Sequence, residues 1–114
     1  MEAMQLEKHM QDDVTVITLD GNLDSNTAPR IQQELIELTP ERSPLLLDLS
    51  RLAYMSSAGL RVLLLVYRHA EQSGSRLALA CVPEDAYEVM SATGFLDFFT
   101  VAPSVHEGVA ALSA

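Results

Sequence analysis

Two short apolar segments restrict the fold of this chain more than any other feature. Leu45–Leu49 and Leu77–Val82 are mostly apolar, Pro44 precedes the first, and Pro83 follows the second. Each segment is too short for a helix, and an apolar strand without alternation has to be covered on both faces, as in a parallel sheet. Helical periodicity in the segments around them predicts an α/β fold.

The other elements follow from apolar spacing and from turn residues. We expect an N-terminal hairpin of a strand at about Gln5–His9 and the β-branched strand Val14–Leu19, joined through Met10–Asp13. Apolar residues three and four apart predict helices, two of which end before Gly74 and Gly94. The predicted helices are Thr27–Leu38, Ser57–Gln72, Glu84–Thr93 and Ser104–Leu112, with a last strand over Phe98–Val101. We therefore expect a single domain over residues 1–114, an α/β sandwich with a mixed, mostly parallel sheet of about five strands and about four helices.

Composition and charge argue against several classes of function. The 114 residues carry seven Lys+Arg against sixteen Asp+Glu, a formal net charge of −9, and such an acidic surface repels the phosphate backbone of nucleic acids. The longest strongly apolar run, Val62–Tyr67, is far shorter than the ~20 residues that span a bilayer. The first residues do not read as a secretion signal. We expect a cytoplasmic protein that binds neither nucleic acid nor membrane.

Enzyme chemistry finds little support in the residues. The three histidines lack the spacing of metal ligands, and the lone Cys81 lies within a predicted apolar strand, where a thiol is more often core than nucleophile. The five glycines form neither a phosphate-binding loop nor a nucleophile elbow. We expect no catalytic residue, no metal and no cofactor. The aromatic cluster Phe95–Phe99 could form a partner surface, but at a short strand near the chain end we expect it to belong to the core.

The most informative stretch, residues 48–60, passes from a buried strand through a loop into the start of a buried helix. Ser56 and Ser57 stand at that start, beside unpaired backbone N–H groups and the positive end of the helix dipole, where a phosphate is favoured. Alternatively, one of them only caps the helix, which is worth about 1 kcal/mol. Gly59 either allows close packing against a strand or keeps the serine accessible.

A second candidate stretch, residues 21–28, leads from a strand into the first helix. Strand-then-helix units place helix starts at one edge of a parallel sheet, so Asp24 and Ser57 should lie at one rim. The alternative is that Asp24 only stabilises a turn or the start of its helix.

These stretches together resemble the STAS domain family, and within it the free-standing anti-sigma-factor antagonists of bacterial partner-switching systems. The resemblance covers about Met4 to Leu112 and implies a STAS-like sandwich. It rests on three separated matches: Tyr54-Met55-Ser56-Ser57-Ala58-Gly59-Leu60, the strand Leu45–Ser50, and Gly21-x-Leu23-Asp24-x-x-Thr27-Ala28. The chain departs from the best-known pattern at Ser56, where many members carry aspartate, and at Ala58, where serine or threonine is frequent.

The resemblance implies a phosphorylation-switched binding protein. The unphosphorylated form would bind an anti-sigma factor with serine kinase activity and release its client. Phosphorylation of Ser57, with Ser56 as the second choice, would abolish binding, and a metal-dependent serine phosphatase would restore it. The residues expected at the partner interface are Asp24, Ser25, Thr27, Ser56, Ser57, Ala58, Gly59 and Arg61.

Two other interpretations remain open from the sequence. A STAS domain can also be a constitutive subunit of a transporter or a signalling scaffold. A phosphoaspartate receiver domain is suggested by the strand Leu45–Leu49, which looks like the strand that carries its acceptor. A receiver also needs an acidic pair after its first strand for Mg²⁺ and a lysine after a late strand, whereas the only lysine is Lys8 and Asp12-Asp13 precede a strand.

Overall fold

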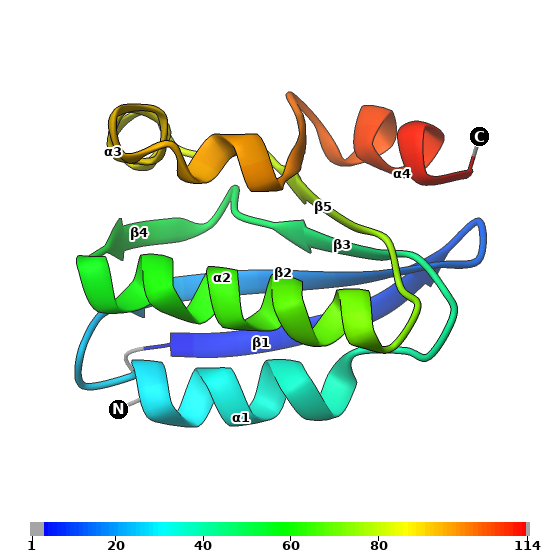
Figure 1. Cartoon of the computed structure of the whole chain (residues 1–114), viewed down its shortest axis with the longest axis horizontal. Helices are drawn as coiled ribbons and strands as arrows, with labels where there is room; N and C mark the ends of the chain where they lie inside the picture. Colours follow the sequence, from blue (N-terminus) through cyan, green and yellow to red (C-terminus); the bar gives the residue numbers. More distant parts are fainter. Residues whose placement is uncertain (1–3, 114) are drawn as a thin grey trace.

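The computed structural model describes residues 4–113, and its elements alternate between strands and helices (Figure 1). The described residues form a six-stranded mixed sheet with the order β1-β2-β3-β5-β6, and β4 pairs with β2. Only β1 and β2 are antiparallel; the other pairings are parallel. The predicted α/β class with a mostly parallel sheet is confirmed. The elements are β1 (Met4–Gln11), β2 (Val14–Leu23), α1 (Ala28–Leu38), β3 (Leu45–Asp48), β4 (Leu52–Met55), α2 (Ser57–Gln72), β5 (Leu77–Ala80), α3 (Glu84–Thr93), the 3-10 helix η1 (Phe95–Phe98), β6 (Thr100–Ala102) and α4 (Val105–Ser113).

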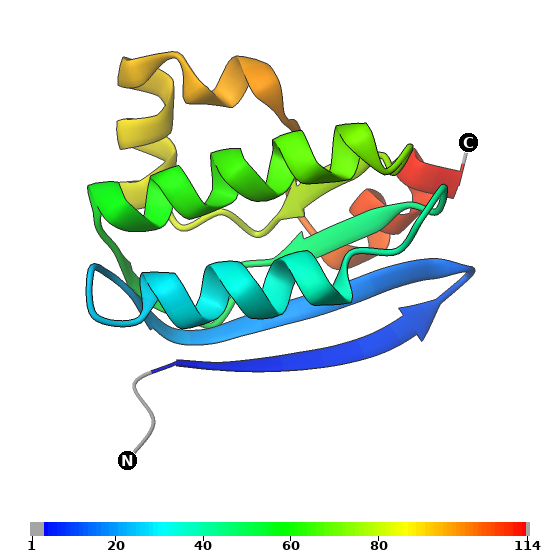
Figure 2. The same cartoon turned by 60° about the horizontal axis from the view of Figure 1, so that its bottom comes forward.

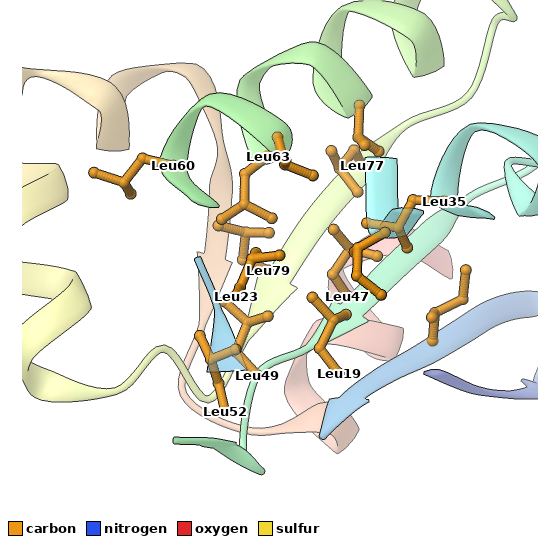
Figure 3. Packing of buried hydrophobic residues seen from close by; sticks show 14 of the residues in the cluster. Leu19, Leu23, Leu35, Leu47, Leu49, Leu52, Leu60, Leu63, Leu77 and Leu79 are labelled. Carbon is orange, nitrogen blue, oxygen red and sulfur yellow. The ribbon is translucent and has the colours of Figure 1, made fainter. Parts of the chain in front are cut away.

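Helices cover both faces of the central strands, as the apolar segments predicted. Figure 2 shows α1 and α2 side by side in front of the sheet and α4 behind it. Successive strand residues point to opposite faces, so Leu45, Leu47 and Leu49 join the core beneath α1 and α2 (Figure 3). Leu46 instead joins a smaller cluster with Val109 and Leu112 of α4. The two apolar clusters fix the sheet between the helix layers.

The N-terminal hairpin is longer than predicted but has the expected pairing. Its turn consists of Asp12 and Asp13, whose φ angles are 50° and 66°. A two-residue hairpin turn with positive φ at both positions matches the right-handed twist of the two strands, and aspartate tolerates that conformation.

Several boundaries differ from the sequence-based expectations. The strand β4 occupies a stretch predicted as loop, so the sheet has six strands rather than about five. The strand β5 ends at Ala80 rather than Val82, because Cys81 takes a left-handed φ of 58°. The last strand begins at Thr100 instead of Phe98.

The aromatic cluster at residues 95–99 is only partly in the core, which corrects the prediction. The residues of η1 are not fully buried, and Phe98 is 48% exposed. Phe95 and Phe99 are half-buried against the main core, and the ring of Phe99 lies 5.5 Å from that of Tyr67, centroid to centroid. The αL conformation of Gly94, which ends α3 as predicted, turns the chain into η1.

Gly59, in the first turn of α2, lies at a close approach between this helix and the sheet. A Cβ atom on Gly59 would lie 2.6 Å from the backbone oxygen of Leu23 and 2.8 Å from Cγ of Met55. Gly59 therefore allows α2 to pack against the ends of β2 and β4. The close-packing interpretation of this glycine is correct.

We expect Gly59→Ala to lower the free energy of unfolding by about 1–3 kcal/mol, because the added methyl group meets fixed backbone. The matched control is Gly108→Ala in α4, where the Cβ would meet a side-chain atom instead of backbone, Cδ1 of Leu46 at 2.8 Å. Urea unfolding of both variants measures the difference. Equal losses would contradict the special role of Gly59.

Candidate functional site

Each α-helix in the described part of the chain begins shortly after a strand that has a parallel partner, at the carboxyl edge of the sheet. Leu23 at the end of β2 pairs with Met55 at the end of β4, and the backbone N–H of Ser56 donates to the oxygen of Leu23 at 3.0 Å. The starts of α1 and α2 are therefore neighbours. We call the segments 23–27 and 55–61 the rim, and the predicted placement of Asp24 and Ser57 at one rim is confirmed.

The two serines of the rim have different environments. Ser56 is the N-cap of α2, and its hydroxyl oxygen accepts from the backbone N–H of Gly59 at 3.4 Å. Ser57 is the first helical residue, its side chain is exposed, and within residues 4–113 its hydroxyl makes no hydrogen bond. Ser56 therefore does the capping, while the hydroxyl of Ser57 is free to react or to bind.

Asp24 organises the turn that leads into α1. Its Oδ1 accepts from the backbone N–H groups of Asn26 at 2.9 Å and Thr27 at 3.2 Å. Its own backbone N–H donates to the hydroxyl oxygen of Thr27 at 3.0 Å. These bonds close an Asx turn, so the structural interpretation of Asp24 is correct. The side chain is still partly exposed, and an interface role is compatible with the turn.

Two residues expected at the partner interface are buried, which corrects that part of the prediction. Thr27 is 7% exposed, and its hydroxyl donates to the backbone oxygen of Asn22 at 2.7 Å. Gly59 is buried against Leu23 and Met55. Both residues shape the rim instead of presenting a surface to a partner.

The remaining predicted residues lie together on the outside of the rim. Ser25 and Arg61 are exposed, Ala58 is half-buried, and all three line a shallow groove between α1 and α2. Arg61 stands one turn after Ser57 on α2 and forms no ion pair within the described chain. An exposed hydroxyl and a free guanidinium are thus adjacent at the start of α2.

A further groove beside Ser57 was missed by the sequence analysis. It lies between β4, the start of α2, and α3, and has a volume of ≈ 360 Å³. Tyr54 and Val89, which line it, are 58% and 47% exposed. The sequence places Tyr54 in a presumed loop and Val89 on a helix without known neighbours, so only the fold brings them together.

Asp48 and Cys81 lie on the α4 side of the sheet. The carboxylate of Asp48 is 8% exposed and accepts from the hydroxyl of Thr18 at 3.1 Å and the backbone N–H of Ser50 at 3.0 Å. Because it is buried and bonded through both oxygens, it is not presented to a phosphodonor as the acceptor of a receiver domain would be.

Cys81 is half-buried just beyond β5, not inside the strand as predicted. Desolvation raises the pKa of its thiol, and the nearby carboxylate of Asp48 raises this pKa further. A hydrogen bond with the Val105 backbone lowers it, but the net effect is a raised pKa. A thiol with a raised pKa is a poor nucleophile near neutral pH.

Residues 4–113 contain neither a metal-binding cluster nor a membrane-spanning helix. No group of three His, Cys, Asp or Glu side chains is arranged to hold a metal ion. None of the helices in this range has the length and apolar character needed to cross a membrane.

Comparison with known proteins defines the class of this chain. The family model described as the STAS domain matches residues 5–108. The chain therefore belongs to the STAS domain family.

Particular relatives and a solved structure agree with this assignment. The Bordetella bronchiseptica protein named "Putative anti-sigma factor antagonist BtrV" is 36% identical over 109 residues, which cover 95% of this chain and 94% of that protein. The anti-sigma F factor antagonist of Paenibacillus polymyxa is 27% identical over 112 residues, 96% of this chain and 93% of that protein. The crystal structure of an anti-sigma factor antagonist from Mycobacterium paratuberculosis shares the fold, with a TM-score of 0.82 and 21% identity over 97% of this chain and 95% of that chain.

We expect Asp24→Ala to lower the free energy of unfolding by about 1 kcal/mol, because two backbone N–H groups lose their acceptor. Asp24→Asn keeps an oxygen at the same place, so its unfolding free energy should stay close to that of the wild type. Thermal or urea unfolding measures both. An equal loss in the two variants would show that the turn depends on the charge of Asp24 and not on the acceptor oxygen.

The raised pKa of Cys81 predicts slow alkylation. At pH 8 iodoacetamide should modify the folded protein more slowly than the urea-unfolded chain, since less thiolate is present. Asp48→Asn removes one cause of the raised pKa, so alkylation of the folded variant should be faster than that of the folded wild type. An unchanged or slower rate in Asp48→Asn would contradict the electrostatic influence of Asp48.

Proposed function

We propose that this chain is an anti-sigma-factor antagonist and that a phosphate on Ser57 switches off its binding to the anti-sigma factor. The observation that carries the proposal is the hydroxyl of Ser57, which is exposed and makes no hydrogen bond within the described residues, at the first position of α2. Two relatives are named as anti-sigma factor antagonists, and each match covers most of the relative and most of this chain. The chain acts as a binding protein and not as an enzyme.

The proposed partner is an anti-sigma factor with serine kinase activity. In its unphosphorylated form the antagonist docks its rim on this factor and displaces the factor's client. The kinase then phosphorylates Ser57 and releases the antagonist, and a metal-dependent serine phosphatase restores the binding form. These partners place the cycle in the cytoplasm. The rim residues proposed to contact the partner are Asp24, Ser25, Ser56, Ser57, Ala58 and Arg61.

The magnitudes indicate how one phosphate can switch such a domain. At an exposed helix N-terminus, a phosphate stabilises the domain by a few tenths to about 1 kcal/mol. In an interface, a charge of about −2 that finds no partner costs several kcal/mol. Since each ~1.4 kcal/mol is tenfold in affinity, the effect on binding is much larger than the effect on the fold.

Ser57→Asp should weaken binding to the anti-sigma factor of the same organism by at least about tenfold, with little change in thermal unfolding. Ser57→Ala removes only an unbonded hydroxyl, so it should bind like the wild type and resist phosphorylation. Titration calorimetry with the purified factor measures the affinities. Binding of Ser57→Asp at wild-type affinity would contradict the switch.

The modified serine can be located directly on protein isolated from its native cells in growth and in stress. Intact-mass analysis with phosphopeptide mapping should find phosphate on Ser57 in one condition. Phosphate on Ser56 would keep the mechanism and move the site by one residue. Unphosphorylated protein in both conditions, held in a stable membrane complex, would favour the alternative of a constitutive subunit of a transporter or scaffold.

A further inference from the structure

We propose that the groove between β4, the start of α2, and α3 is the second half of the docking surface, and that it receives an apolar side chain of the anti-sigma factor flanked by a basic residue. This inference rests on the proposed function and extends the interface beyond the rim to α3. It assigns specificity-determining roles to Tyr54, Asp85 and Val89, none of which the sequence placed at the interface.

The first support is the geometry around Ser57. Residues of β4, α2 and α3 line the groove, with Ser57 on its α2 wall and Asp85 and Val89 on its α3 wall. A second groove, between α2 and α3, is lined by Ser57, Leu64, Val89 and Phe95 among others. Ser57 and Val89 belong to both grooves. A partner that covers Ser57 therefore also meets the α3 wall.

The second support is the exposed apolar surface in this groove. Tyr54 and Val89 are two of the six large apolar residues in the described part of the chain that are exposed by 36% or more. Both line the same groove, and the buried side chains of Leu60 and Ala86 also line it. Clustered apolar side chains that surround a polar reactive group are typical of an interface centre.

The third support is the charge on the α3 wall. Glu84, Asp85 and Glu88 are all exposed, and no ion pair within residues 4–113 involves them. Of the three carboxylates, that of Asp85 lines the groove, and it favours a partner segment with Lys or Arg on the α3 side. On the α2 side the partner's apolar group covers Ser57, so a phosphate there loses water and the partner supplies no basic group to it. This arrangement explains why the added charge weakens binding although the α3 wall attracts basic groups.

The test compares two residues of α3 that are equally exposed but face different sides. Val89 and Tyr87 are both 47% exposed, and Tyr87 lines another pocket with Cys81 and Val101. We expect Val89→Ala and Tyr54→Ala each to weaken binding to the anti-sigma factor by at least about fivefold, as truncation of an interface anchor does. Tyr87→Ala should stay within about twofold of the wild type. Asp85→Lys should weaken binding and reduce its dependence on salt concentration.

Each outcome separates this inference from the proposed function. If Ser57→Asp loses binding while Tyr54→Ala and Val89→Ala bind like the wild type, the groove is not part of the interface and the switch stands. Equal effects of Val89→Ala and Tyr87→Ala would also overturn the inference, because they indicate a general effect on α3. If the free chain sediments as a dimer and Val89→Asp sediments as a monomer, the groove binds a second copy of the chain instead. If the wild-type chain binds no anti-sigma factor, the proposed function fails and this inference fails with it.

Discussion

The approach of α2 to the end of β2 is the contact on which the site depends. Gly59 lies against the backbone oxygen of Leu23, and the same oxygen accepts from the N–H of Ser56. A capping serine, Ser56, and a glycine three residues later are thereby fixed to one strand end. Ser57 lies between them in sequence, and its side chain is exposed. The hydroxyl of Ser57 is thus attached to a fixed segment of backbone, and the contacts that fix this segment do not involve it.

This division of roles explains why the residues of the rim are not equivalent. Asp24, Thr27, Ser56 and Gly59 make the hydrogen bonds and close contacts that shape the rim. Ser25, Ser57 and Arg61 are exposed and contribute little to the fold. Substitution of the first group alters stability and binding together, whereas substitution of the second group reports on binding alone. A loss of function at Asp24 is therefore informative only when stability is measured beside it.

The two-sided sheet gives the domain the rigidity that the proposed switch requires. Leu45, Leu47 and Leu79 pack beneath α1 and α2, and Leu46 packs beneath α4. Removal of a large side chain from such a core lowers the free energy of unfolding by several kcal/mol. A surface phosphate changes it by only about 1 kcal/mol. The proposed modification would therefore act on what the surface can bind, and the conformation of the domain need not change.

The sequence by itself determined the α/β class, the four helices to within a residue or two, and the place of Ser57 at a helix start. These features depend on local patterns: apolar spacing, capping residues and glycines such as Gly94. It also carried the motif around residues 54–60 that indicated the family. Only the tertiary structure decided that β4 is a strand, that Thr27 and Gly59 are buried, and that Tyr54 and Val89 share a groove. A four-residue strand with one buried side chain has no periodicity to detect, and its pairing with β2 is a long-range contact. Which exposed residues face each other depends on how α3 packs against the rest of the domain, and no local pattern encodes that packing.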